Sequence, residues 1–223
     1  MSVVRVLNIV REYKLGKTKL SALRGVSIEI ERGEFVAICG PSGSGKTTLL
    51  NIIGCLDKPT TGTVQIVNQE ILTLSDRKLS ELRNKSIGFI FQNFNLMPVL
   101  TAYENVEYPL WILGKSTIER KRMVLKMLEE VGLLEHKNHK PDELSGGQRQ
   151  RVAIARALVT MPSIVLADEP TANLDGESAR IVIDILKDLN KKGQTIVMVT
   201  HEEEYGNETD RIIWLRDGKI DTE

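Results

Sequence analysis

Residues 34–47 read EFVAICGPSGSGKT, and this stretch decides the fold. The run EFVAIC, residues 34–39, is apolar on both faces of an extended chain, which predicts a strand buried in the middle of a sheet. The next eight residues match the pattern GxxxxGK[ST], and a helix-forming run, TTLLNII, follows. A strand, a glycine-rich turn and a helix in this order predict a loop that cradles the phosphates of a nucleotide.

The candidate phosphate-binding residues are consecutive. Glycines adopt backbone conformations closed to other residues, so that successive N–H groups can turn toward the phosphates. Lys46 adds a positive charge for the β- and γ-phosphates, and Thr47 adds a hydroxyl for Mg²⁺. A plain glycine turn, the alternative, leaves the preceding strand, the lysine and the hydroxyl unexplained. The predicted nucleotide-binding residues of this loop are Gly40, Pro41, Ser42, Gly43, Ser44, Gly45, Lys46, Thr47 and Thr48.

A second candidate element, SIVLADEP at residues 163–170, is an apolar strand that ends in two carboxylates. A carboxylate at a buried strand end is costly unless a cation or hydrogen bonds compensate it, so we expect Asp168 to hold the Mg²⁺ that accompanies the nucleotide. Glu169 follows directly. In an extended chain its side chain points to the other side, where it can accept a proton from an attacking water. The alternative is that both acids merely begin a loop.

Outward from these motifs, the composition excludes several classes of protein. The 223 residues carry 30 basic and 30 acidic side chains, so the chain lacks the positive charge expected of a general nucleic-acid binder. No apolar run approaches the roughly 18 residues that span a bilayer, and we expect a cytoplasmic location. Cys39 and Cys55 stand among small or aliphatic neighbours, which predicts buried, reduced thiols.

The rest of the chain predicts one α/β domain over residues 1–223. Short alternating strands open it, and from residue 145 helices alternate with apolar strands, which predicts a mostly parallel sheet. Two helical segments between residues 101 and 132 each begin with a reciprocal cap, and a hairpin is expected at the Asp217–Gly218 pair. We therefore expect a catalytic core made of residues 1–92 and 160–223, with residues 93–159 as a helical subdomain.

Several side chains carry these helix predictions. The caps pair Thr101 with Glu104 and Ser116 with Glu119. A third helix, near residues 177–190, is expected to bury a stripe of Ile181, Ile185 and Leu189.

Residues 144–148 read LSGGQ and begin a long amphipathic helix. Ser145 and Gln148 fit an S-x-x-Q capping box, which explains the serine and the glutamine. It does not explain Gly146 and Gly147, because each glycine in a helical turn costs about 1 kcal/mol relative to alanine. We expect an anionic ligand to approach the bare backbone at this helix end.

With GPSGSGKT, LADEP and LSGGQ in one chain, the sequence resembles the ATP-binding-cassette (ABC) ATPases from end to end. The resemblance implies a P-loop NTPase fold with a mostly parallel sheet, an N-terminal antiparallel β subdomain and an inserted helical subdomain. It also implies ATP and Mg²⁺ as ligands. Two subunits are expected to pack head to tail on ATP binding, so that residues 145–148 of one close over the ATP of the other.

The same resemblance assigns roles to residues outside these motifs. Tyr13 stands where the family stacks an aromatic ring on adenine, although a lone aromatic residue is more often part of a core. Gln92 corresponds to the glutamine that reaches Mg²⁺ and the attacking water. Asp175 matches an aspartate at the dimer interface, and His201 matches the histidine that contacts the γ-phosphate. The expected catalytic residues are thus Glu169, His201, Gln92 and Lys46. His136 and His139, flanked by lysines, are expected to be solvated.

The resemblance further implies ATP hydrolysis coupled to an integral membrane permease subunit, which would place the chain on the inner face of the membrane. A short helix of that subunit is expected to dock near Gln92, where residues Phe94, Leu96, Met97 and Leu100 cluster, unless they only pack the insertion onto the sheet. Residues 52–64, 87–110 and 165–175 look most like the ATPases of lipoprotein-release and macrolide- or peptide-export systems. The alternative is a signalling subunit of a cell-division or cell-wall complex. A soluble translation or DNA-repair ATPase is disfavoured, because such proteins carry a second cassette or a long coiled coil, for which 223 residues with one P-loop leave no room.

Overall fold

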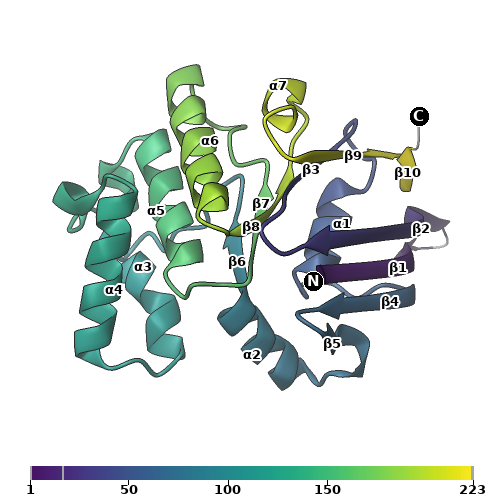
Figure 1. The fold of residues 1–223 in the computed structure, drawn as a ribbon, viewed down its shortest axis with the longest axis horizontal. Coiled ribbons are helices and arrows are strands. Elements are labelled where there is room, and N and C mark those ends of the chain that lie inside the picture. The colour runs from purple at the N-terminus through teal and green to yellow at the C-terminus, as the bar shows by residue number, and fades with distance from the viewer. Residues whose placement is uncertain (1, 17, 222–223) are drawn as a thin grey trace.

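The structure, a computed structural model, describes residues 2–16 and 18–221, which form two sheets and their covering helices (Figure 1). The strands are β1 (Ser2–Leu15), β2 (Thr18–Glu31), β3 (Phe35–Cys39), β4 (Thr61–Ile66), β5 (Gln69–Glu70), β6 (Ile87–Ile90), β7 (Ile164–Asp168), β8 (Thr195–Val199), β9 (Arg211–Arg216) and β10 (Lys219–Asp221). The α-helices are α1 (Lys46–Ile53), α2 (Asp76–Ser86), α3 (Ala102–Ile112), α4 (Thr117–Glu130), α5 (Gly146–Leu158), α6 (Gly176–Lys191) and α7 (Glu203–Gly206).

The six-stranded sheet has the order β10-β9-β3-β8-β7-β6, and only the β9–β10 pair in it is antiparallel. Strands β3 and β8 are buried at every residue, as strands covered on both faces must be. The parallel α/β core expected from the sequence is confirmed. It aligns the carboxyl ends of β3, β7 and β8 along one edge, where the phosphate-binding loop, Asp168, Glu169 and His201 lie.

The second sheet is antiparallel, with the order β2-β1-β4-β5. Strands β1 and β2 have 14 residues each, longer than the short strands expected from the sequence. Their pairing runs from Ser2↔Glu31 to Leu15↔Thr18 and is interrupted by register shifts, which bend the hairpin. The long hairpin carries Tyr13 to the mouth of the phosphate-binding loop.

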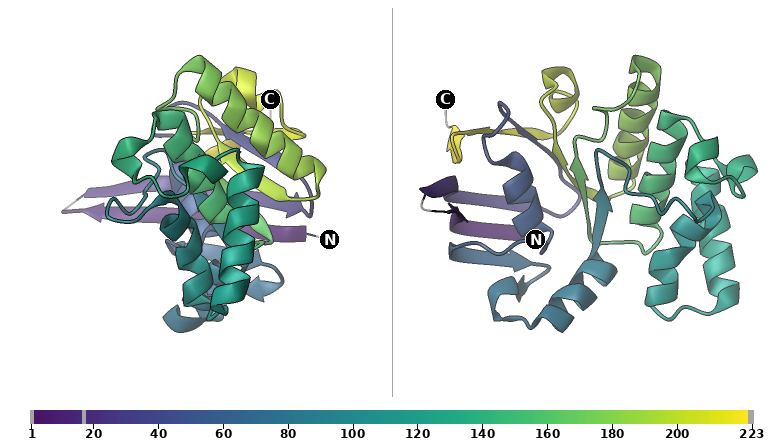
Figure 2. Two further views of the ribbon diagram at one scale, coloured as in Figure 1. Left: turned by 90° about the vertical axis from the view of Figure 1, so that its left-hand side faces the viewer. Right: turned by 180° about the vertical axis from the view of Figure 1, so that it is seen from behind.

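Two hydrophobic cores lie on opposite faces of the parallel sheet. Alternation along β8 sends Val197 and Val199 into the first core, which α1, α2 and the antiparallel sheet cover. Ile196 and Met198 enter the second core, which α3, α4, α5 and α6 cover. Figure 2 shows the antiparallel sheet and the helical layer on opposite sides of this central sheet. Helices α1 and α5, the two that begin at glycine-rich motifs, are therefore on different faces.

The reciprocal caps expected at the starts of α3, α4 and α5 are all present. Residues 93–159 hold helices and loops without a strand, in a range that the structure describes completely. The sequence reasoning missed α2, whose polar sequence buries only Leu79 and Leu82. The stripe expected on α6 is confirmed only in part. Ile185 and Leu189 are partly buried against the second core, whereas Ile181 is 41% exposed. The buried residues of α6 are Ala179, Val182, Ile183 and Leu186. Among the described residues, no helix has both the length and the apolar character to cross a bilayer.

Candidate functional site

The loop between β3 and α1 closes around the amine of Lys46. This side chain is only 6% exposed, and its Nζ donates hydrogen bonds to the carbonyl oxygens of Gly40 at 2.8 Å and Pro41 at 2.9 Å. Gly45 caps α1 in the left-handed conformation, with φ of 103°. The arrangement places a cation and the start of a helix at one point, which is the chemistry that an anionic phosphate group requires.

Neighbouring strands leave no space for side chains at two glycines of this loop. A Cβ on Gly40 would lie 2.0 Å from the carbonyl oxygen of Leu215 in β9, and a Cβ on Gly45 would lie 2.5 Å from that of Ala22 in β2. Close backbone packing therefore requires these glycines, in addition to the phosphate binding expected from the motif. The phosphate-binding loop lies wedged between the two sheets.

The turn between β9 and β10 completes the support of the loop. Gly218 donates its N–H to the carbonyl oxygen of Ser44 at 3.0 Å and accepts a hydrogen bond from the N–H of Arg24 at 2.8 Å. A Cβ at Gly218 would lie 2.7 Å from the carbonyl oxygen of Ala22. The predicted hairpin at residues 217–218 thus links the phosphate-binding loop to β2.

A cavity of about 300 Å³ opens over the loop and brings several predicted residues together. Glu169 lies at one side of it, and Tyr13 and Leu20, which are paired across the β1–β2 hairpin, form another wall. The remaining lining comes from Ser21, Ala22, Ser42, Gly43, Gly45, Lys46, Thr47 and Thr48. The cavity thus combines an aromatic wall with a phosphate-binding floor. Ser44, in contrast, is buried, with its Oγ unpaired among the described residues.

Thr47 and Asp168 meet at the edge of the sheet, as the motifs predict. The hydroxyl of Thr47 donates a hydrogen bond to Oδ1 of Asp168 at 3.1 Å. Burial raises the pKa of Asp168, and this hydrogen bond opposes the shift. A hydroxyl and a desolvated carboxylate at this distance form a hard-oxygen donor pair of the kind that Mg²⁺ binds.

Glu169 and His201 come from the ends of two adjacent parallel strands. Nδ1 of His201 lies 3.3 Å from Oε1 of Glu169. The backbone of Glu169 has a φ of 46°, and its N–H donates to the carbonyl oxygen of Val199 at 2.9 Å. The chain is therefore not extended here, so the alternation argument for the two carboxylates was wrong. Asp168 and Glu169 both face the phosphate-binding loop because Glu169 has a left-handed backbone, a strained state found at functional sites.

Tyr13 is partly buried, and its ring is held from one side. Cζ of Arg11 lies 4.5 Å from the ring centroid, and the Tyr13 hydroxyl donates to Oδ2 of Asp57 at 2.7 Å. The ring also lines the cavity described above. Tyr13 therefore forms a wall of this cavity and is not a residue of the hydrophobic core, and its stacking on adenine stays a prediction.

Gln92 follows β6, one strand away from the end of β7, and is exposed. No described residue forms a hydrogen bond with its side chain, so no such bond links Gln92 to Thr47 or Asp168. Its carbonyl oxygen accepts a hydrogen bond from Nδ2 of Asn173 at 3.0 Å. The sequence reasoning missed Asn173, which lies between Glu169 and Asp175 and ties that segment to the Gln92 loop.

The LSGGQ motif lies away from the cavity, and none of residues 145–148 is among its described lining. Its capping box is present: the Ser145 N–H donates to Oε1 of Gln148 at 2.9 Å, and the Gln148 N–H donates to Oγ of Ser145 at 3.2 Å. Packing within the chain explains Gly147, because a Cβ there would lie 2.6 Å from Oγ of Ser178 in α6. Gly147 is therefore required by this packing, and the expected ligand at both glycines stays a prediction. At Gly146 the nearest atom to a Cβ would be 3.6 Å away, on Leu174, so only this glycine lacks an explanation within the chain.

Asp175 caps α6 in this structure. Its carboxylate accepts hydrogen bonds from the N–H and the Oγ of Ser178, both at 2.9 Å, and these bonds lower the pKa of Asp175. The residue lies outside the nucleotide cavity. Its expected role across a dimer interface stays a prediction.

The two histidines expected to be solvated are partly buried instead. The rings of His136 and His139 lie 5.2 Å apart, and Nε2 of His136 is 3.1 Å from Nε2 of Gln148. Both Nδ1 atoms are buried. The turn that carries these histidines packs against the start of α3, where the Ala102 N–H donates to the carbonyl oxygen of His139. The prediction of solvent exposure, which was based on the flanking lysines, is therefore wrong for both histidines.

Cys39 and Cys55 are buried as predicted, and burial raises the pKa of Cys55 to about 11.

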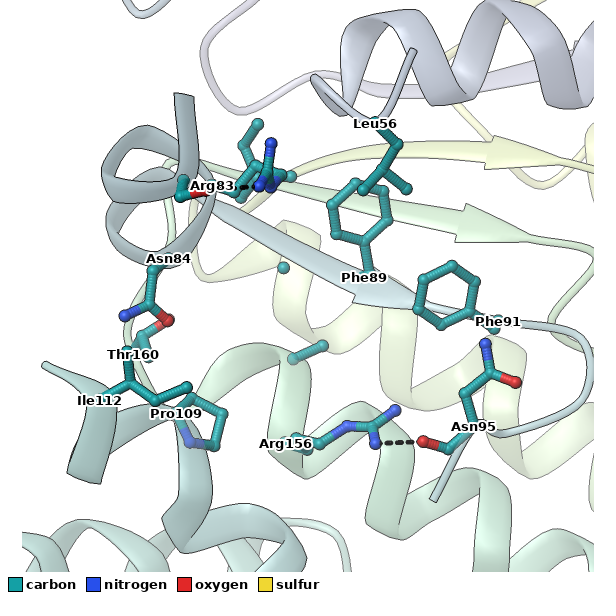
Figure 3. Close-up of a pocket in the computed structure, with 14 residues that line it drawn as sticks. Leu56, Arg83, Asn84, Phe89, Phe91, Asn95, Pro109, Ile112, Arg156 and Thr160 are labelled. Carbon is teal, nitrogen blue, oxygen red and sulfur yellow. Dashed lines mark hydrogen bonds between the residues drawn. The ribbon is translucent and has the colours of Figure 1, made fainter. Parts of the chain in front are cut away.

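A groove of about 440 Å³ runs between α2, β6, α3 and α5 (Figure 3). The rings of Phe89 and Phe91 stack 5.4 Å apart along one wall, and Arg83 and Arg156 lie within it. Apolar lining also comes from Leu56, Ile87, Pro109, Ile112 and Ala157. The four residues expected to form an apolar surface near Gln92 are partly buried, and one of them, Leu96, packs against the second core. The groove thus lies beside the predicted cluster and uses different side chains.

Comparison with known proteins shows the family to which the chain belongs. The family described as ABC transporter matches residues 23–172 of the chain. The chain belongs to the ABC transporter family. As an ABC ATPase, it hydrolyses ATP on a P-loop NTPase fold.

Two relatives and one solved structure illustrate the similarity of this ABC ATPase to known proteins. An uncharacterized ABC transporter ATP-binding protein of Thermotoga maritima is 49% identical over 98% of this chain and 94% of its own. A macrolide export ATP-binding/permease protein, MacB of Bdellovibrio bacteriovorus, is 48% identical over 99% of this chain, which matches only 34% of MacB. The ATP-binding cassette MJ0796 of Methanocaldococcus jannaschii, solved as a post-hydrolysis dimer with ADP and Pi, superposes with a TM-score of 0.91 at 48% identity, over 98% of this chain and 96% of its own.

Proposed function

We propose that this ABC ATPase forms a homodimer on ATP binding and that closure of the dimer drives a separate membrane permease subunit. The observation that carries the proposal is the separation of the two glycine-rich helix starts. Lys46 begins α1 on one face of the parallel sheet, whereas Ser145 caps α5 on the other, outside the nucleotide cavity. A two-fold dimer would bring the second motif of each subunit to the cavity of its partner. The dimer of MJ0796 supports this arrangement.

In the proposed mechanism, Lys46 and the N–H groups of the loop bind the phosphates of ATP, and Thr47 with Asp168 would hold Mg²⁺. When bound, Mg²⁺ would supply positive charge beside the phosphates. Glu169 accepts a proton from the water that attacks the γ-phosphate, because its carboxylate faces the loop and is 24% exposed. His201, 3.3 Å from Glu169, orients this water.

Three further residues complete the proposed site. Tyr13 stacks on adenine, since its ring forms a wall of the nucleotide cavity. Gln92 lies on an exposed loop and would contact Mg²⁺ and the attacking water after a movement of that loop, and Asp175 would contact the partner subunit. The movement of Gln92 would require release of the hydrogen bond between its carbonyl oxygen and Asn173.

The groove beside β6 is the proposed docking site for a short helix of the membrane subunit. Its apolar walls fit an apolar helix face. Arg83 and Arg156 lie in the groove, and no acidic side chain is among its described lining. Neither guanidinium forms an ion pair with a described residue. The docking helix is therefore expected to bring a carboxylate to this pair.

We propose export of a macrolide or peptide, or release of a lipoprotein, as the work of the complex, with the ATPase peripheral on the cytoplasmic face of the membrane. MacB proteins support the export assignment, since they join an ATP-binding part that resembles this chain to a permease within one polypeptide. If the ATPase and the permease are separate polypeptides, the complex requires a contact surface between them, such as the groove.

Substitution of Glu169 tests the dimer directly. Glu169→Gln keeps the size of the side chain and removes the base, so ATP hydrolysis should fall by about 100-fold or more while ATP binding is retained. The unhydrolysed ATP should then trap a dimer, visible by size-exclusion chromatography with light scattering. Glu129→Gln, at an exposed position of α4, is the matched control and should stay monomeric with normal turnover. A Glu169→Gln variant that hydrolyses ATP normally, or stays monomeric with saturating ATP, contradicts the proposal.

A further inference from the structure

Two side chains of β1 and one from the loop after α1 form a polar cluster where β1 extends beyond its pairing with β4. Arg11 and Tyr13 lie on β1, and Asp57 lies in the loop after α1. Arg11 binds Asp57 in a fork, with Nε to Oδ2 at 2.9 Å and Nη2 to Oδ1 at 2.7 Å. The Tyr13 hydroxyl donates to the same Oδ2 at 2.7 Å. Both members of the ion pair are 23% exposed, so water only partly screens it.

The cluster fixes the Tyr13 ring in two ways. The guanidinium of Arg11 lies over one face, 4.5 Å from the centroid, within the range of a cation–π contact. The hydroxyl bond to Asp57 then sets the direction in which the ring points. Asp57 is itself fixed, because its Oδ1 also accepts a hydrogen bond from the N–H of Lys58 at 2.8 Å.

Tyr13 separates two hollows of the surface. Arg11 and Asp57 line a polar cleft of about 410 Å³ but are absent from the described lining of the nucleotide cavity. Tyr13 and Leu20 line the nucleotide cavity and are absent from the described lining of the polar cleft. The Arg11–Asp57 pair thus supports the ring from behind and does not reach the nucleotide.

We propose that Arg11 and Asp57 are positioning residues that hold Tyr13 ready for the adenine base, an inference that rests on the proposed stacking of Tyr13 on adenine. Binding to a ring that is already fixed avoids the cost of ordering it when the nucleotide arrives. Loss of either support should therefore weaken binding of ATP and leave the binding of the phosphates unaffected.

The test compares ATP with inorganic tripolyphosphate, both with Mg²⁺, by calorimetry on the isolated chain. Arg11→Ala and Asp57→Asn should each weaken ATP binding by about twofold to tenfold, the amount set by ordering one side chain, and leave tripolyphosphate binding unchanged. Arg11→Lys keeps the cation over the ring but loses the fork, and it should recover part of the loss. Equal weakening for both ligands, or unchanged ATP affinity in both variants, would overturn the proposal.

Matched variants serve as controls for the comparison of ATP with tripolyphosphate. Arg5 lies on the same strand and pairs with Glu29 at 2.7 Å, far from the cavity lining, so Arg5→Ala should change neither affinity. Tyr13→Phe removes only the hydroxyl and should match Asp57→Asn, which covers the case that Arg11→Ala is too unstable to study. Tyr13→Ala tests the stacking itself. If Tyr13→Ala leaves ATP affinity unchanged, the assignment of Tyr13 fails; if only Tyr13→Ala weakens it, the positioning role alone fails.

Discussion

Gly147 shows how one residue of a ligand-binding motif can be required by the fold of its own chain. A Cβ at this position would lie 2.6 Å from Oγ and 2.9 Å from Cβ of Ser178. Ser178 cannot simply rotate away, because its Oγ also donates to the carboxylate of Asp175. Gly147 therefore lets α5 and α6 approach at the point where both helices begin.

Alanine substitutions at the two adjacent glycines should have opposite effects on stability. Gly147→Ala should lower the free energy of unfolding by about 1–3 kcal/mol, because it overpacks the contact with α6. Gly146→Ala meets no atom of the chain closer than 3.6 Å and should raise this free energy by about 0.5–1 kcal/mol through helix propensity. Urea denaturation of both variants provides the measurement. Equal stability of the two variants would show that Ser178 does not restrict this position.

The position of most of the proposed catalytic residues could be predicted from the sequence because each belongs to a short local motif. Lys46 and Thr47 stand within one loop, and Asp168 and Glu169 end one strand. The role of Arg11 could not be predicted, since its partner Asp57 lies 46 positions away and only the fold joins them. The orientation of Glu169 was missed for a related reason: its left-handed backbone depends on the neighbouring strand, to which its N–H is bonded.

At the scale of elements, α5 connects the LSGGQ motif to the loop that follows Gln92. Phe94 and Asn95 both have left-handed backbones, with φ of 60° and 48°, and each such residue costs about 1 kcal/mol or more. Arg156 of α5 donates hydrogen bonds to both of their carbonyl oxygens. Arg149, two turns earlier on the same helix, lies over the Phe94 ring at 5.2 Å. A shift of α5 would therefore move this loop.

Replacement of Arg156 should loosen the loop. Arg156→Lys keeps the charge but has one compact ammonium in place of the planar fork, so it should lose one of the two carbonyl contacts. Amide hydrogen exchange in residues 92–98 should then become faster, with exchange in β7 and β8 unchanged. The control, Arg77→Lys, alters an exposed pair with Glu81 on α2. Unchanged exchange in residues 92–98 would show that Arg156 does not restrain the loop.

Helices and their buried faces were predicted correctly where the residues that determine them are close together in the sequence. The caps of α3, α4 and α5 were predicted because each cap involves two residues three positions apart. Helix α2 was missed because it buries only two leucines. The face of α6 was predicted only in part, with Ile181 exposed, because the sheet determines which of its many apolar residues become buried.

At the scale of the whole molecule, both cysteines report on opening of the fold. Cys39 ends β3 and Cys55 follows α1, so they flank the phosphate-binding loop, and both are buried. Burial raises the pKa of each thiol, that of Cys55 to about 11, so that little reactive thiolate exists in the folded state.

Both thiols should react with Ellman's reagent only when the protein opens, and fully in guanidinium chloride. ATP with Mg²⁺ should slow the reaction of the native protein, because a ligand that binds only the folded state stabilises it. At a concentration 100 times its Kd, the ligand should slow reaction through global unfolding by about 100-fold. Lys46→Ala, which lacks the buried amine of the loop, should lose this protection. Rapid labelling of native protein, insensitive to ATP, would show that the thiols are reached by local fluctuations.

The hydrogen bond from Gly218 to the carbonyl oxygen of Ser44 bears on the biosynthesis of the protein. The turn that supports the phosphate-binding loop is synthesised 174 residues after Ser44, and it follows every described helix and all the parallel strands. A nascent chain on the ribosome can therefore form the helices around α5 before its phosphate-binding loop has all of its supports. Nucleotide binding should thus begin only after Gly218 has been synthesised and has left the ribosome.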